Sequence, residues 1–174
     1  VGLSSTGVER TMTELRILKD NSDAVVIASI FAGTIEEFGE TASLIDENIC
    51  DMIEVNISCP NVADEFGLPF ASDPKISGEI TRVAKDNTKL PVIIKLSPNY
   101  PNICEVARAC EANGADGITA INTLGPGMLI DIHTYTPKLS NKKGGVSGPA
   151  IFPIALRIVY DLYKAVHIPI IGMG

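Results

Sequence analysis

The sequence lacks several features that would indicate particular classes of protein. It has no Trp, only two His residues, and aromatic side chains make up 5% of its 174 residues. Its four cysteines form no C-x-x-C pair, which excludes the common zinc and redox spacings, so no metal site is expected. Four cysteines in a chain of this size need not form a disulfide framework. We interpret them as cytosolic thiols and expect a cytoplasmic protein.

Basic charge and long apolar runs are also scarce. Lys and Arg total 14 against 21 Asp and Glu, which gives a formal charge of −7. A nucleic-acid-binding protein normally carries a basic surplus. The longest apolar stretch, around Ala24–Gly33, is interrupted by Ser29 and is shorter than the ~20 residues of a membrane span. The N-terminal residues lack the basic region of a signal peptide. Neither a nucleic acid nor a membrane is therefore an expected partner.

Apolar residues make up 45% of the sequence, which is enough to form a core. Five short runs rich in Val and Ile are typical of buried parallel strands, which are almost continuously apolar because both of their faces are covered. The expected strands are Ala24–Ile30, Met52–Ser58, Val92–Leu96, Gly117–Ile121 and Ile168–Ile171.

Amphipathic helical patterns alternate with these strands. A capping-box pattern at Thr34 and Glu37 starts one helix, whose expected apolar face continues to Ile49. Asp73 and Pro74 supply the N-cap and first-turn proline of the next helix. Further helices are expected over 8–18, 103–110 and 151–166, whereas 123–148 is expected to form a long loop.

The alternation of strands and helices predicts an α/β fold with a parallel sheet. The first and last expected strands end near residues 29 and 172, so four repeats occupy 143 residues, or about 36 each. Eight such units need about 286 residues, near the size of a (β/α)8 TIM barrel with insertions, which is typically ~250. We therefore expect residues 1–174 to be the central part of one barrel, a fragment of about five strands, rather than an open doubly wound sheet.

Polar or glycine residues follow every expected strand. In a parallel barrel the carboxyl ends of the strands meet at one mouth, where catalytic groups gather. Five such endings in succession predict a polar site at that face. They are Ser29, Asn56–Asn61, Lys95, Asn122-Thr123 and Gly172–Gly174.

The segment Asn56–Asn61 is the most informative of these endings. It places the carboxamides of Asn56 and Asn61 close in sequence to the Cys59 thiol, so that they can hold a planar, amide-rich substrate beside it. A free thiol has a pKa of ~8.5, so Cys59 would act as a base only after local tuning. The other three cysteines, at 50, 104 and 110, fall on expected helix faces or ends and are interpreted as small buried hydrophobes.

Lys95 lies inside an apolar strand, where a buried ammonium needs a partner. Its chemistry alone leaves three readings open: a structural ion pair, a Schiff base, or a positive charge beside an electron-rich cofactor.

Glycines mark two candidate phosphate-binding segments. Gly144–Pro149 leads into the last expected helix, whose N-terminus can stabilise an anion, and Gly172–Gly174 follows the last strand. Plain turn chemistry explains either segment equally well. His133 and His167 lie away from the strands' carboxyl ends and are expected to be surface or structural residues.

In these motifs the sequence resembles class 1 dihydroorotate dehydrogenases, the FMN flavoenzymes of pyrimidine synthesis. The matching segments are Asn-Ile-Ser-Cys-Pro-Asn, Ile-Lys-Leu-Ser-Pro-Asn, Ala-Asp-Gly-Ile-Thr-Ala-Ile-Asn-Thr, Gly-Gly-Val-Ser-Gly-Pro-Ala-Ile and Ile-Pro-Ile-Ile-Gly-Met-Gly, at 56–61, 94–99, 115–123, 144–151 and 168–174. The resemblance is strongest to class 1B and implies an oxidoreductase that converts dihydroorotate to orotate.

The resemblance also implies roles for individual residues. Cys59 would be the base that removes a proton from C5 of dihydroorotate, while FMN accepts a hydride from C6. The substrate-binding residues would be Gly2, Leu3, Asn56, Asn61, Asn122 and Thr123. The residues beside FMN would be Ser29, Asn56, Lys95, Ile121, Gly148 and Gly174, with Lys95 at the edge of the flavin where negative charge accumulates on reduction.

Partners follow from the same resemblance. A homodimer is expected, with a second subunit that carries FAD and an iron–sulfur cluster and passes electrons to NAD⁺. Because the family's early strands and last strand are missing from these 174 residues, we expect them alone neither to bind FMN tightly nor to turn over.

Three other readings compete with this one. The FMN barrel of dihydropyrimidine dehydrogenase shares two of the motifs but typically has His at the position of Asn61. A barrel lyase would use Lys95 as a Schiff base, and a non-catalytic remnant would need none of the strand-end residues.

Overall fold

The structure is a computed structural model and describes residues 6–58 and 70–174. Its helices are α1 (Val8–Asn21), α2 (Ile35–Ser43), η1 (Phe70–Ser72), α3 (Pro74–Asp86), α4 (Ile103–Ala112), η2 (Pro149–Ile151) and α5 (Phe152–Ala165). Its strands are β1 (Ile27–Ile30), β2 (Met52–Asn56), β3 (Val92–Lys95), β4 (Gly117–Ala120), β5 (Leu124–Gly127), β6 (Ile130–Asp131), β7 (Thr136–Pro137), β8 (Gly144–Val146) and β9 (Ile170–Gly172).

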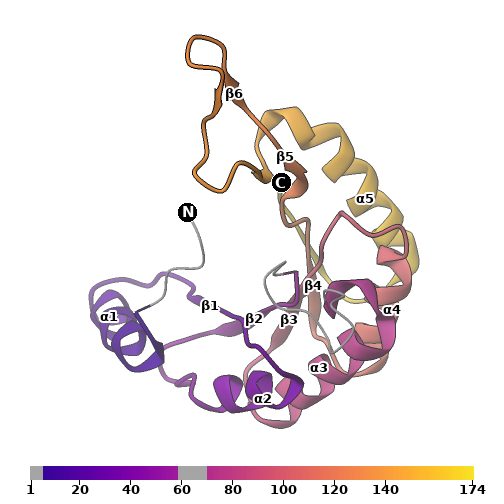
Figure 1. Cartoon of the computed structure of the whole chain (residues 1–174). Helices are drawn as coiled ribbons and strands as arrows, with labels where there is room; N and C mark the ends of the chain where they lie inside the picture. Colours follow the sequence, from indigo (N-terminus) through magenta and orange to yellow (C-terminus); the bar gives the residue numbers. More distant parts are fainter. Residues whose placement is uncertain (1–5, 59–69) are drawn as a thin grey trace.

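Five strands form one parallel sheet in the order β1-β2-β3-β4-β9. The sheet curves, and α2, α3, α4 and α5 lie along its outer side (Figure 1). A doubly wound sheet reverses its strand order at a switch point, whereas a barrel adds each strand beside the preceding one. Here the order never reverses, which confirms the predicted succession of barrel-type β/α units.

The two faces of the sheet differ in chemistry. Val55, Ile94 and Ile118 lie in one row across β2, β3 and β4, and all three are fully buried within the core. Their neighbours in sequence point to the opposite face, because side chains alternate along a strand. Glu54 and Lys95 lie on that opposite face. The predicted strands therefore supply both an apolar core and a face with charged groups.

Helix starts follow the predicted capping chemistry. The Thr34 hydroxyl accepts a hydrogen bond from the Glu37 amide at 3.2 Å, and the Glu37 carboxylate accepts one from the Gly33 amide at 2.8 Å. The Asp73 carboxylate accepts from the Lys75 amide at 2.7 Å, with Pro74 in the first turn. Within residues 6–58 and 70–174, no helix combines the length and the apolar character that crossing a membrane requires.

Some predicted boundaries are wrong. The first strand begins at Ile27 rather than Ala24, and α2 ends at Ser43, so Ile45 and Ile49 do not extend its helical face. Both side chains are nevertheless buried, at 8% and 2% exposure. They reach the core from the connection to β2, because burial of an apolar side chain does not require a helix. The first helix extends beyond the predicted residue 18, to Asn21.

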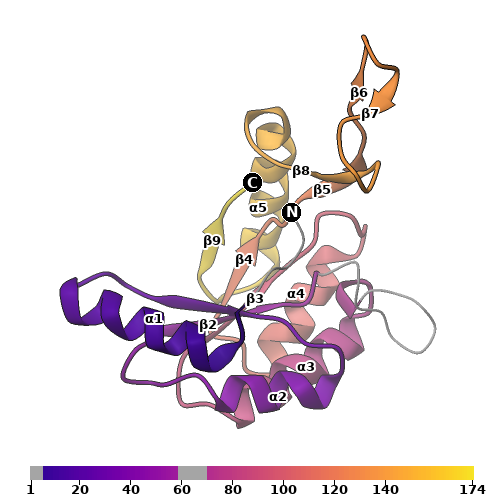
Figure 2. The same ribbon diagram turned by 60° about the vertical axis from the view of Figure 1, so that its left-hand side comes forward.

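The segment 123–148 is not the structureless loop that the sequence suggested. It contains two antiparallel pairs, β5 with β8 and β6 with β7, and projects beyond the sheet (Figures 1 and 2). Its strands are only two to four residues long, and β5 and β8 are rich in glycine, so they carry little of the apolar periodicity from which strands are predicted. Their pairing depends on contacts between residues far apart in the segment.

Candidate active site

The carboxyl ends of the strands bring predicted site residues together. The Asn122 side chain donates to Asn56 Oδ1 at 3.3 Å, and the Ser58 amide donates to the same oxygen at 3.1 Å. The Ser58 hydroxyl donates to the Lys95 carbonyl at 2.8 Å. These contacts connect the ends of β2, β3 and β4, so the prediction that polar residues converge here is confirmed for Asn56, Lys95 and Asn122.

Lys95 forms an ion pair, one of the three readings left open by the sequence, with a partner that the sequence analysis did not identify. Its Nζ lies 3.4 Å from Glu54 Oε1, and the Ser29 hydroxyl donates to the same oxygen at 3.0 Å. The side chains of Lys95 and Glu54 are only 19% and 9% exposed. The signal that could have found Glu54 is the one that singled out Lys95, a charged residue in an apolar strand. Of the three readings of Lys95, the ion pair is the one that the structure shows.

Thr119 of β4 lies directly across from Lys95 of β3 in the strand register. Its side chain is fully buried, and its hydroxyl has no hydrogen-bond partner among the described residues. Buried hydroxyl groups normally have a partner, because leaving one unpaired costs free energy. The residue paired with Lys95 in the register of β3 and β4 therefore carries a buried polar group without a partner among the described residues.

A cavity of about 230 Å³ opens at the strand ends, and its lining includes the polar residues Ser58, Asn99, Asn122 and Thr123. The Asn99 side chain holds one wall, since it donates to the Thr123 carbonyl at 3.2 Å and accepts from the Gly125 amide at 3.0 Å.

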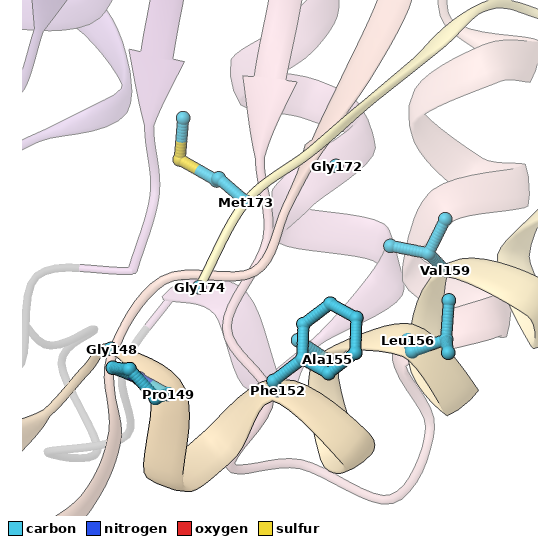
Figure 3. A pocket seen from close by; sticks show the side chains of 9 residues that line it. All are labelled: Gly148, Pro149, Phe152, Ala155, Leu156, Val159, Gly172, Met173 and Gly174. Carbon is cyan, nitrogen blue, oxygen red and sulfur yellow. The ribbon is translucent and has the colours of Figure 1, made fainter.

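A second and larger cavity, of about 620 Å³, lies between β9 and the start of α5 (Figure 3). Gly148 borders it with φ of 89°, a conformation that favours glycine. Gly174 also borders it, and a Cβ atom there would lie 3.0 Å from the Ala155 Cβ. The Ile121 amide donates to the Met173 carbonyl at 2.8 Å, which keeps this end of the chain beside β4. The two glycine segments singled out in the sequence thus meet at one cavity.

Four predicted site residues, Gly2, Leu3, Cys59 and Asn61, lie outside the described residues. The other predictions about cysteine and histidine are confirmed in outline. Cys50 and Cys110 are buried and Cys104 is half-buried. Burial raises the pKa of all three thiols, that of Cys110 to about 11. His133 and His167 are exposed.

Comparisons with known proteins identify the family of the chain. The family model described as dihydroorotate dehydrogenase matches residues 1–174. The chain is 48% identical over its full length to the dihydroorotate dehydrogenase B (NAD(+)) catalytic subunit of Desulforamulus reducens and 44% identical to that of Methanothermobacter thermautotrophicus. It covers 57% and 56% of these two proteins, so it spans just over half their length.

Among solved structures, the chain is similar to the dihydroorotate dehydrogenase of Eimeria tenella in complex with ferulenol, with a TM-score of 0.70 at 16% sequence identity. The match covers 99% of this chain and 55% of the Eimeria chain. The carboxyl transferase domain of Rhizobium etli pyruvate carboxylase matches 66% of this chain with a TM-score of 0.51. These structures support the fold: a piece of a TIM barrel. With the family model matching throughout and the relatives close in sequence, the chain belongs to the dihydroorotate dehydrogenase family.

Proposed function

We propose that the protein to which this chain contributes oxidises dihydroorotate to orotate with FMN as its cofactor, in pyrimidine biosynthesis. The observation that carries the proposal is the meeting of Asn56, Asn122 and Lys95 on one face of the sheet, at its carboxyl end. Family membership supplies the reaction, and this face supplies the groups that the reaction needs. Residues 1–174 would form the central part of a single FMN-binding barrel.

Two groups of described residues would hold FMN, one at its flavin end and one at its phosphate end. Lys95 offers a partly exposed cation on this face of the sheet, whereas the hydroxyl of Thr119, its neighbour in the strand register, is fully buried. Gly148 and Gly174 border the larger cavity, where their backbone amides would hold the phosphate group (Figure 3). Ser29 and Ile121 would line the flavin between these ends. When bound, FMN supplies the hydride acceptor.

The chain's own residues would hold the substrate and take its proton. Asn56, Asn122 and Thr123 present amide and hydroxyl groups at the strand ends, where they can pair with the ring carbonyls and N–H groups of dihydroorotate. Asn61, Gly2 and Leu3 are proposed to complete this set. The Cys59 thiolate would accept the proton from C5, so that Cys59 is the general base.

The partner is proposed from the relatives. Their names describe the catalytic subunit of an NAD(+)-type enzyme. We infer that this protein likewise delivers electrons to NAD⁺ through a second subunit bearing FAD and an iron–sulfur cluster, and that the catalytic subunit is a homodimer in the cytoplasm.

The first test is Cys59→Ala in the full-length protein. We expect FMN to stay bound, because the thiol is proposed to contact substrate rather than cofactor. The rate at which dihydroorotate bleaches the flavin absorbance should fall at least 100-fold, the lower range of what a positioned general base contributes. Stopped-flow spectroscopy in the visible absorption band of the flavin measures that rate.

Cys110→Ala is the matched control, because this buried thiol lies in α4 and should not affect the rate of bleaching. An unchanged rate in Cys59→Ala would remove Cys59 from the mechanism. Bleaching by dihydrouracil and not by dihydroorotate would favour the dihydropyrimidine dehydrogenase reading instead. A colourless protein that borohydride cross-links to a carbonyl substrate would favour the lyase reading of Lys95.

A further inference from the structure

Glu54 has no role in the function proposed above, although it is the acidic partner of Lys95. We propose that Glu54 is a positioning residue that balances the charge of Lys95 and thereby sets the reduction potential of the bound flavin. This inference rests on the proposed function, since it assumes that Lys95 lies beside FMN. It adds a residue to which the strand-end motifs do not point.

The geometry gives Glu54 a defined place on the sheet. Glu54 lies in β2, and its carboxylate crosses to β3 to reach Lys95 Nζ at 3.4 Å. Ser29 in β1 donates to the same oxygen at 3.0 Å, so three adjacent strands contribute to one contact. A side chain held from two sides in this way has little freedom to rotate. The Lys95 ammonium is therefore held in one position on this face.

Burial makes the pair electrostatically strong. The Glu54 side chain is 9% exposed and the Lys95 side chain 19%, whereas most other ion pairs of the described residues have at least one partner that is more than 40% exposed. Water screens a charge pair less when the pair is buried. Any group bound beside Lys95 therefore experiences both charges, that of the ammonium and the opposing charge of Glu54.

The sign of the effect follows from this arrangement. Lys95 favours the reduced flavin, because reduction adds negative charge near the ammonium. Glu54 opposes that effect, so the pair gives a smaller stabilisation of the reduced flavin than Lys95 would give alone. Removing the charge of Glu54 should therefore raise the reduction potential, and removing the charge of Lys95 should lower it.

The decisive measurement is the midpoint potential of bound FMN in full-length protein carrying Glu54→Gln. Glutamine keeps the size of the side chain and its capacity to accept a hydrogen bond from Ser29, so only the charge is lost. We expect the equilibrium between oxidised and reduced flavin to shift about tenfold toward the reduced form, which is about 30 mV for a two-electron couple. Lys95→Met should shift the equilibrium in the opposite direction.

Asp116→Asn is the matched control. Asp116 forms an ion pair with Lys85 at 2.6 Å, but it lies just before β4, at the other end of the sheet. The same loss of one negative charge there should leave the ratio of reduced to oxidised flavin within about twofold of the wild-type ratio. A general effect of net charge would instead move Asp116→Asn and Glu54→Gln alike, and that result would overturn the proposal.

A second comparison covers the case in which Glu54→Gln does not fold. The double variant Glu54→Gln/Lys95→Met removes both charges and so leaves no unpaired ion in the sheet. Its ratio of reduced to oxidised flavin at equilibrium should be about tenfold higher than that of Lys95→Met alone. Equal potentials in these two variants would overturn the proposal. A structural role alone would change thermal stability and leave the potential unmoved.

The outcomes also separate this inference from the proposed function. A wild-type protein that carries no flavin would contradict the function itself. A wild-type protein that carries flavin and is bleached by dihydroorotate, combined with Glu54→Gln at the wild-type potential, would contradict only the role of Glu54.

Discussion

At the scale of single residues, the environment of a side chain decides its chemistry more than its type does. Lys95 is paired with a buried carboxylate, whereas Lys85 forms a more exposed pair at the other end of the sheet. The three described cysteines are small buried or half-buried groups, and burial raises the pKa of each thiol. None of them resembles the thiolate that a general base requires, and the proposed base is Cys59.

The buried thiol of Cys110 predicts a pH dependence of stability. Burial raises its pKa to about 11 in the folded protein, above the ordinary thiol value of the unfolded chain. Between about pH 9 and pH 11 the native state keeps a proton that the unfolded state has released, so the free energy of unfolding falls as pH rises. The contribution of Cys110 is at most about 3 kcal/mol, fully present below pH 9.

Urea denaturation at pH 8 and pH 10.5 measures this dependence. In Cys110→Ala the difference between the two pH values should be smaller than in wild type, since the group that loses its proton is gone. If the variant shows the full wild-type difference, the thiol of Cys110 does not contribute to it.

At the scale of secondary-structure elements, close packing between neighbouring helices places specific demands on residue size. Gly78 of α3 faces α4, where an added Cβ would lie 2.7 Å from Asn113 Nδ2 and 3.3 Å from the Ala109 carbonyl oxygen. The Asn113 side chain is not free to move away without cost, because it donates to that carbonyl at 2.8 Å. The glycine therefore lets the two helices approach, although glycine is a poor helix former.

Gly78→Ala is consequently expected to destabilise the protein. Helix propensity alone would stabilise it by about 1 kcal/mol, but overpacking costs about 1–3 kcal/mol, so we expect a net loss of about 1 kcal/mol. Thermal or urea denaturation measures the change. Glu79→Ala, an exposed neighbour on the same helix, is the control and should change stability by less than about 0.5 kcal/mol. Stabilisation by Gly78→Ala would show that the helices can separate freely.

At the scale of the whole molecule, the described sheet is open at both edges. Ile27 in β1 and Ile171 in β9 are 40% and 39% exposed, and the helices α2 to α5 lie on the outer side of the sheet rather than over the face that carries Lys95 (Figure 1). A closed barrel encloses such a face and positions groups from all of its strands around a ligand. The candidate site is therefore only partly enclosed by these residues.

This openness predicts weak cofactor binding by residues 1–174 on their own. We expect a polypeptide of this length to bind FMN at least 100-fold more weakly than the full-length protein, because fewer groups surround the ligand. Quenching of flavin fluorescence on titration measures both affinities. The isolation of a yellow 174-residue polypeptide that dihydroorotate bleaches would contradict this expectation.

The sequence by itself determined the succession of strands and helices, the capping at Thr34 and Asp73, and the gathering of Asn56, Lys95 and Asn122 at one edge of the sheet. These features are local, or follow from the rule that carboxyl ends of parallel strands meet, so apolar periodicity and short motifs are sufficient to predict them.

Only the tertiary structure decided the partner of Lys95, the unpaired Thr119 hydroxyl and the antiparallel pairs within 123–148. Each of these depends on strand register or on contacts between residues distant in sequence. A charged residue in a strand shows that a partner is needed, but which carboxylate provides it depends on which strands lie side by side and on how far each has shifted along its neighbour.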